Sequence, residues 1–337
     1  MCQSHHPALR SGRYPFNKYM PRAETPDNGK RTINISRYIE PPEQAMRLVS
    51  RIIRHTWPIW HAILCSDVSL FYEENGKTTI AFPEPVAKIT EDNLEATMSA
   101  FEEVAAHITF IWNPNEDGVT LPERDILLPT LPGVGSLIAT PKHLLNHLKQ
   151  AESTQDHIWT AWLNFEIASL IVHELAHACT IAATPIGLEP ELSNLADAYL
   201  GPHVATSEIG FEVEQRVWGG IPYQHDHARP GQGEIRHRPA LGNWSEAPVI
   251  FVTCEWPDER VVHDYASAQG YGFMRAIGET AGKEVRGERT LQEVSTSWLG
   301  QLFEERFWRR LDWSDRGALW IPETTGFRVD GKNEPVV

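Results

Sequence analysis

The feature that most constrains the fold is a long apolar segment over residues 158–181. Apolar side chains occur on nearly every face of the helix that this segment predicts, and not on a single stripe. They are Trp159, Trp162, Leu163, Phe165, Ile167, Leu170, Ile171, Val172, Leu175 and Ala176. Pro185 and Gly187 would end the helix. Because a helix that is apolar all round has to be buried, we expect this segment to run through the core.

Three polar side chains interrupt this helix, in the sequence His173-Glu174-Leu175-Ala176-His177. The two histidines are four residues apart, which places both imidazoles on one face, one turn apart. In that arrangement they can bind one tetrahedral zinc ion, and Glu174 would project beside the metal. Buried polar groups need partners, so these residues predict a metal site. The alternative is a hydrogen-bonded histidine–glutamate cluster without a metal.

This helix, with its apolar flanks, resembles the active-site helix of the zincin metallopeptidases. The metzincin branch would have Gly at position 180 and His at position 183, where this chain has Thr180 and Ala183. The gluzincin branch takes its third metal ligand from a Glu on a later helix. The resemblance therefore implies a gluzincin-like site in which His173 and His177 bind zinc and Glu174 is the acid/base residue.

A later segment, residues 207–214, carries three glutamates and fits the position of that third ligand. Its beginning, Ser-Glu-Ile-Gly-Phe, is similar to the Asn-Glu-Gly-Phe segment of zinc aminopeptidases, with Ser in place of Asn and one residue inserted. The resemblance implies that Glu208 is the third ligand. Asp197, His203 and Glu212 are the alternative ligands. A solvated acidic face is the alternative interpretation of the three glutamates.

Two further glutamates of this segment are candidates to orient a ligating imidazole. Glu212 lies one helical turn after Glu208, so one carboxylate can bind the metal while the other hydrogen-bonds to a histidine. The spacing Glu208-x-Gly-x-x-x-Glu214, together with the aromatic stretch 298–308, is similar to a group of fungal zincin-like proteins. That similarity makes Glu214 the second candidate and implies a fungal intracellular or biosynthetic context.

Zincins often stabilise the oxyanion of the tetrahedral intermediate with a Tyr or a His. Tyr223, His225 and His227 closely follow the predicted ligand helix, and Tyr223 is our candidate for this role. Residues 222–247 are rich in His, Arg, Gly and Pro and predict a long loop. The alternative is therefore that these are ordinary side chains of an exposed loop.

The chain divides into three predicted regions. Residues 1–35 carry six Lys or Arg and two acidic residues, and they predict an extended arm. Residues 36–184 predict an N-terminal zincin subdomain with a small twisted sheet, which ends in the HExxH helix. Residues 185–337 predict a mainly helical C-terminal subdomain that supplies the third ligand and includes a helix over 290–311. The predicted fold class is therefore α+β, with a zincin-like catalytic core.

The small sheet has a predicted role in substrate binding. Residues 67–72 and 77–82 flank Glu-Asn-Gly and predict a β-hairpin. In zincins an edge strand aligns an extended substrate by β-pairing. The resemblance implies that Thr78–Phe82 or Ile108–Trp112 serves as that strand. Residues 113–141 are rich in Pro and Gly and carry only a short apolar piece at 126–128.

Composition excludes several classes of partner. The formal net charge is −15, which argues against binding to nucleic acids or to anionic membranes. No stretch of about 18 apolar residues predicts a membrane span. The first thirty residues contain no apolar run that predicts a secretory signal. The four cysteines, at positions 2, 65, 179 and 254, form no Cys-x-x-Cys pair. We therefore expect a cytoplasmic protein.

These patterns predict a zinc-dependent hydrolase, similar to metallopeptidases, which cleaves an amide bond of a peptide or a small molecule with metal-activated water. A non-peptidase metalloenzyme that acts on a small metabolite in a fungal biosynthetic pathway is the first alternative. A catalytically inactive zincin-like binding protein is the second, although a purely structural site has no need of Glu174.

Overall fold

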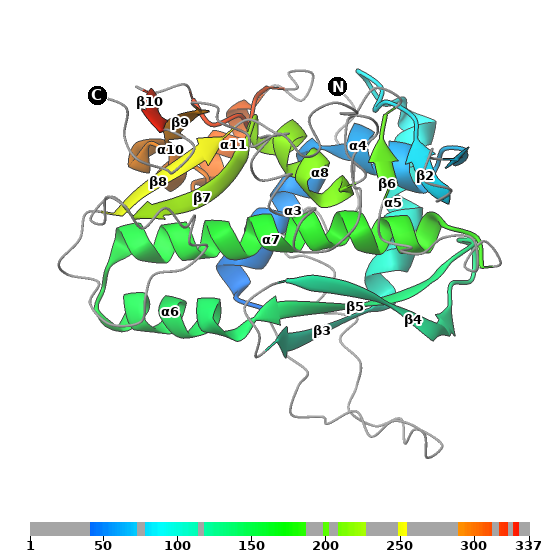
Figure 1. Ribbon diagram of the computed structural model, residues 1–337, viewed down its shortest axis with the longest axis horizontal. Helices are drawn as coiled ribbons and strands as arrows, with labels where there is room; N and C mark the ends of the chain where they lie inside the picture. Colours follow the sequence, from blue (N-terminus) through cyan, green and yellow to red (C-terminus); the bar gives the residue numbers. More distant parts are fainter. Residues whose placement is uncertain are drawn as a thin grey trace, which may run out of the picture. The chain divides into compact units, whose positions relative to one another are not determined.

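The computed structural model describes residues 41–72, 78–113, 118–186, 198–201, 208–226, 249–254, 289–311, 317–322 and 326–329 (Figure 1). The chain forms two compact units, Met1–Val213 and Glu214–Val337, with the boundary inside helix α8 (Ile209–Trp218). Helices and small sheets occur in both units, which confirms the α+β class. The predicted arm over 1–35 lies outside the described residues, and the predicted boundary at 184 stays a prediction.

Helix α7 (His157–Ala183) is the centre of the first unit and confirms the predicted buried helix. Its 27 residues span about 40 Å. The carboxylate of Asp156 caps its start by accepting a hydrogen bond from the backbone N–H of Trp159 at 3.0 Å. Among the described helices, α7 alone is long and apolar enough to cross a membrane, but 89% of its most apolar stretch is buried inside the protein. Such burial is what a core helix requires.

Four helices of the first unit pack against α7. They are α3 (Glu43–His55), α4 (Trp57–Leu64), α5 (Glu91–Ala106) and α6 (Lys142–Ser153). The break between α3 and α4 falls at Thr56, and Pro58 stands in the first turn of α4, where a missing N–H costs nothing. On α5, the hydroxyl of Thr90 accepts from the backbone N–H of Asn93 and caps the helix. These helices enclose the apolar sides of α7.

A three-stranded sheet covers another side of α7 (Figure 1). Its strands are β3 (Ile108–Asn113), β4 (Val119–Leu127) and β5 (Val134–Pro141), in the order β3-β5-β4. β3 runs parallel to β5 and β4 runs antiparallel to it. Neither β4 nor β5 was predicted. Pro122 and a run of charged residues hide the strand pattern of β4, and the Gly and Pro residues in and around β5 favoured a loop. β4 forms one edge of this sheet, and it contacts α7.

A second sheet of the first unit contains β1 (Ser69–Tyr72), β2 (Thr78–Phe82) and β6 (Ala198–Leu200). β1 and β2 pair antiparallel, as the predicted hairpin requires. β6 pairs parallel with the other side of β2. The prediction that Thr78–Phe82 is an edge strand is therefore wrong, because β2 has a neighbour on each side and no free edge to offer a substrate.

The second unit contains a four-stranded antiparallel sheet in the order β10-β9-β8-β7. The strands are β7 (Ile221–Asp226), β8 (Val249–Cys254), β9 (Arg289–Glu293) and β10 (Gly326–Val329). The predicted helix over 290–311 is wrong: its start is β9, and two short helices follow, α10 (Thr296–Gln301) and α11 (Glu305–Arg310). β7 also occupies the start of the predicted loop over 222–247. The described part of this region is thus less helical than predicted, because strand pairing overrides local spacing.

Candidate metal centre

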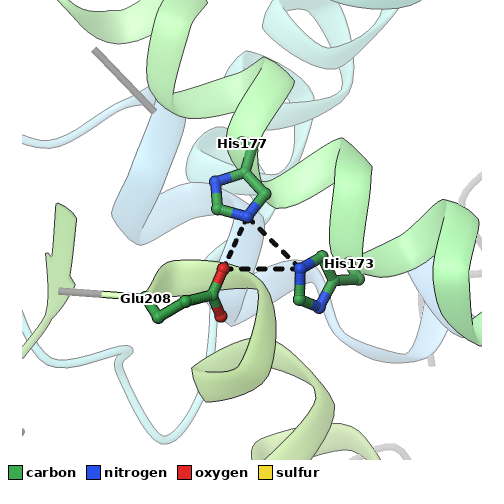
Figure 2. Close-up of side chains that lie close together, drawn as sticks. All are labelled: His173, His177 and Glu208. Carbon is green, nitrogen blue, oxygen red and sulfur yellow. Dashed lines mark hydrogen bonds and ion pairs between the residues drawn. The ribbon is translucent and has the colours of Figure 1, made fainter. Parts of the chain in front are cut away.

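His173 and His177 lie one turn apart on α7, and their Nε2 atoms are 3.3 Å from each other (Figure 2). Both side chains are buried, with exposed fractions of 7% and 9%. Buried apolar residues of α7 flank both histidines. The predicted placement of both imidazoles on one face of a buried helix is therefore confirmed.

Glu208 brings a carboxylate to the same point from a separate element. Its Oε1 lies 2.7 Å from Nε2 of His177 and 3.4 Å from Nε2 of His173. Its Oε2 accepts a hydrogen bond of 2.6 Å from the backbone N–H of Phe211. Glu208 immediately precedes the first residue of α8, so this second oxygen caps the helix while the first faces the histidines.

The three facing atoms have the separations that a metal ion requires. A tetrahedral zinc with bonds of about 2.0–2.1 Å would hold its ligand atoms about 3.3 Å apart. Two of the three separations here are 3.3 and 3.4 Å, and the third, His177 to Glu208, is a hydrogen-bond distance of 2.7 Å. Two imidazoles and one carboxylate are also a donor set that divalent transition metals favour. This buried group could therefore hold a metal ion.

The charges of the group are coupled. Burial would raise the pKa of Glu208, but His173 and His177 outweigh it through charge and hydrogen bonding and hold this pKa well below its ordinary value. Burial lowers the pKa of His177, but Glu208 raises it by more, and Glu174 adds to the rise, so the net pKa is above the ordinary value. The lowered pKa of Glu208 favours the ionised carboxylate, which is the form that binds a cation.

Glu174 lies on the side of α7 that faces the sheet, and only 4% of it is exposed. The hydroxyl of Thr120, on β4, lies 2.7 Å from Oε2 of Glu174 and 3.0 Å from its carbonyl oxygen, and can donate to either. A Cβ atom at Gly118 would lie 2.7 Å from Oε1 of Glu174. Thr120 of β4 and Gly118 just before this strand therefore approach the two carboxylate oxygens of Glu174.

The first turn of α8 packs directly against His173. A Cβ atom at Gly210 would lie less than 3.0 Å from three ring atoms of His173, a separation that real Cβ atoms essentially never show. The ring of Phe211 meets the same imidazole edge-on, with the ring centroids 4.7 Å apart. Glycine at position 210 is therefore required for Glu208 to reach the histidines. In the sequence, Gly210 stood out only as part of the segments that resemble known families.

The remaining predicted site residues have different outcomes. Glu208, Glu212 and Glu214 are all buried, so the solvated acidic face is excluded. The backbone N–H of Glu212 donates to the carbonyl of Glu208 at 3.3 Å, within the first turn of α8. An orienting role for either Glu212 or Glu214 stays a prediction.

The predicted oxyanion residue, Tyr223, belongs to β7 in the second unit, and its role stays a prediction. His225 is in the same strand. The alternatives Asp197 and His203, and also His227, lie outside the described residues.

Sequence reasoning missed Gly118 and Thr120, because no local pattern connects an unrecognised strand with a helix more than fifty residues later.

Comparison of this chain with protein-family models, with curated proteins and with solved structures gives no match.

Proposed function

We propose that this protein is a zinc-dependent hydrolase with a zincin-like core, which cleaves an amide bond. The observation that carries the proposal is the convergence of His173, His177 and Glu208 from two helices, with Glu174 beside them on α7. A structural metal site needs ligands alone, whereas an acid/base residue next to the ligands is a requirement of catalysis. The buried carboxylate of Glu174 supports the catalytic interpretation.

The residues divide the proposed work between binding and proton transfer. His173, His177 and Glu208 would hold the zinc ion, which supplies Lewis acidity and lowers the pKa of water. Glu174 would take the proton that the water loses when its oxygen attacks the amide carbon. It would then pass that proton to the leaving nitrogen, so that the C–N bond breaks to an amine and a carboxylic acid.

Strand β4 is the proposed substrate strand, in place of the two strands suggested by sequence. It is an edge strand, and its residue Thr120 hydrogen-bonds to Glu174. Ile108–Trp112, within β3, is at the other edge of the sheet, with β5 between it and β4. An extended peptide that pairs with β4 would therefore run past the proposed base. One that pairs with β3 would have β3 and β5 between itself and β4.

The test combines metal content with turnover, on the full chain purified without added metal. We expect about one zinc per chain, and hydrolysis within a panel of fluorogenic peptides and small N-acyl amides. The variant Glu174→Gln should keep the zinc but turn over about 10²–10⁴-fold more slowly, because the amide cannot accept the proton. Glu95→Gln, at an exposed position on α5, is the matched control. Equal rates in wild type and Glu174→Gln would refute the proposed role, and cleavage of the small amides alone would indicate a non-peptidase.

A further inference from the structure

Thr120 contacts Glu174 across the boundary between the sheet and the core helix. The hydroxyl is within hydrogen-bond distance of both Oε2, at 2.7 Å, and the carbonyl oxygen, at 3.0 Å. It has only one proton to donate, and the shorter bond, to a carboxylate oxygen, is also the stronger one because its acceptor carries charge. This contact therefore fixes the terminal torsion of Glu174, which is otherwise soft.

The strand that carries this hydroxyl is itself held in place. Thr120 is 7% exposed and pairs with Ile138 in the register between β4 and β5. Two residues earlier, Gly118 lies so close to α7 that a Cβ there would be 2.6 Å from Leu170 and 2.7 Å from Glu174 Oε1. The carboxylate is thus bonded at one oxygen and confined at the other. A rigid support of this kind is what holds a proton-transfer group within reach of its substrate.

We propose that Thr120 is a positioning residue that holds the carboxylate of Glu174 in a single orientation for proton transfer. This inference rests on the hydrolase function proposed above. The hydroxyl takes one acceptor position of Oε2, and the carboxylate keeps its remaining acceptor positions for the proton. Because the hydroxyl belongs to the proposed substrate strand, the same strand would align the substrate and orient the base.

The variants separate the hydroxyl from the shape of the side chain. Thr120→Val keeps the shape and removes the donor, and Thr120→Ser keeps the donor. Thr140→Val is the matched control, because Thr140 is buried in the neighbouring strand β5 and its hydroxyl has no hydrogen-bond partner among the described residues. For Thr120→Val we expect kcat to fall about 10- to 100-fold, the usual effect of losing a hydrogen bond to a charged group, with KM and zinc content nearly unchanged. Thr120→Ser should restore most of the rate.

Crystal structures of the same variants give a second measurement that does not depend on turnover. We expect one conformer of the Glu174 side chain in wild type and in Thr120→Ser, and several in Thr120→Val. A single unchanged conformer in Thr120→Val, or an equal loss of rate in Thr140→Val, would overturn the inference. If the wild type hydrolyses nothing while Glu174 becomes disordered only in Thr120→Val, the positioning role stands and the proposed hydrolase function fails.

Discussion

Two sides of one turn of α7 make different contacts. On the α8 side, both histidines meet Glu208, and His173 also meets Gly210 and Phe211; these contacts bring together the three side chains that could hold a metal ion. On the β4 side, Glu174 meets Gly118 and Thr120, and those contacts bear on the orientation of a carboxylate. The difference teaches that the proposed metal binding and the proposed turnover depend on different contacts: changes beside α8 should alter the first, and changes beside β4 the second.

The largest effect is expected when the α8 side loses both imidazoles. A His173→Ala, His177→Ala double variant should contain no tightly bound zinc, because a single carboxylate cannot hold the ion in competition with water. Elemental analysis of the purified protein is the measurement. His157→Ala is the control, since this histidine is exposed at the start of α7. Zinc content that stays the same in the double variant would show that the metal binds elsewhere and would break the comparison.

The next effect is expected at the third ligand. Glu208→Ala should lower zinc affinity by more than the 10–100-fold that follows from losing a residue that only orients a ligand. It also removes the cap of α8, so the affinity should be measured by competition with a chelator at a temperature where circular dichroism shows folded protein.

Glu212→Ala provides the comparison, because Glu212 is equally buried one turn later. An affinity loss in Glu212→Ala as large as in Glu208→Ala would contradict the assignment of Glu208 as the ligand.

The sequence alone identified the centre of this site but not its surroundings. The apolar periodicity of α7 and the spacing of its histidines are local, so both could be predicted and were confirmed. Glu208 could be proposed only through resemblance, because nothing in the intervening thirty residues specifies how the chain returns to α7.

Strand β4 was missed for a different reason. Its sequence, with Pro122 followed by charged residues, has the composition of a loop, and only its pairing with β5 makes it a strand. Thr120 could therefore not be connected with Glu174 before the structure was known.

A smaller effect is expected from the glycine that lets α8 approach. In Gly210→Ala the new methyl group would collide with the ring of His173, and neither a ring nor a helix backbone yields easily. We expect about 1–3 kcal/mol lower stability, as for other overpacked cores, and roughly tenfold weaker zinc binding.

Gly300→Ala on α10 is the control, because a Cβ there would meet nothing within 4 Å. Denaturation and chelator competition measure the two quantities. Unchanged zinc affinity in Gly210→Ala would mean that α8 can move away without releasing Glu208. The packing of α8 against His173 would then not control zinc affinity.

The smallest effect concerns Glu166, a carboxyl two turns before Glu174 on α7, which sharpens the contrast with Glu208. Burial raises the pKa of Glu166 to about 8, and the neighbouring Trp162 offsets that rise only in part. Glu208 has the opposite shift because two imidazoles face it. The histidines therefore make a buried carboxylate available as a ligand, and burial without them favours the neutral acid.

The sign of the resulting pH dependence follows from the direction of the shift. The folded state binds the proton of Glu166 more tightly than the unfolded state, so its contribution to stability is complete below the unfolded pKa and is lost as the pH rises towards 8. Glu166→Gln mimics the neutral acid. Between pH 5 and pH 9, we therefore expect the free energy of unfolding to fall by about 1–2 kcal/mol more in wild type than in Glu166→Gln. Urea denaturation at several pH values measures this, with exposed Glu95→Gln as the control. Parallel stability profiles for wild type and Glu166→Gln would mean that Glu166 is ionised when folded, and burial alone would then not distinguish it from Glu208.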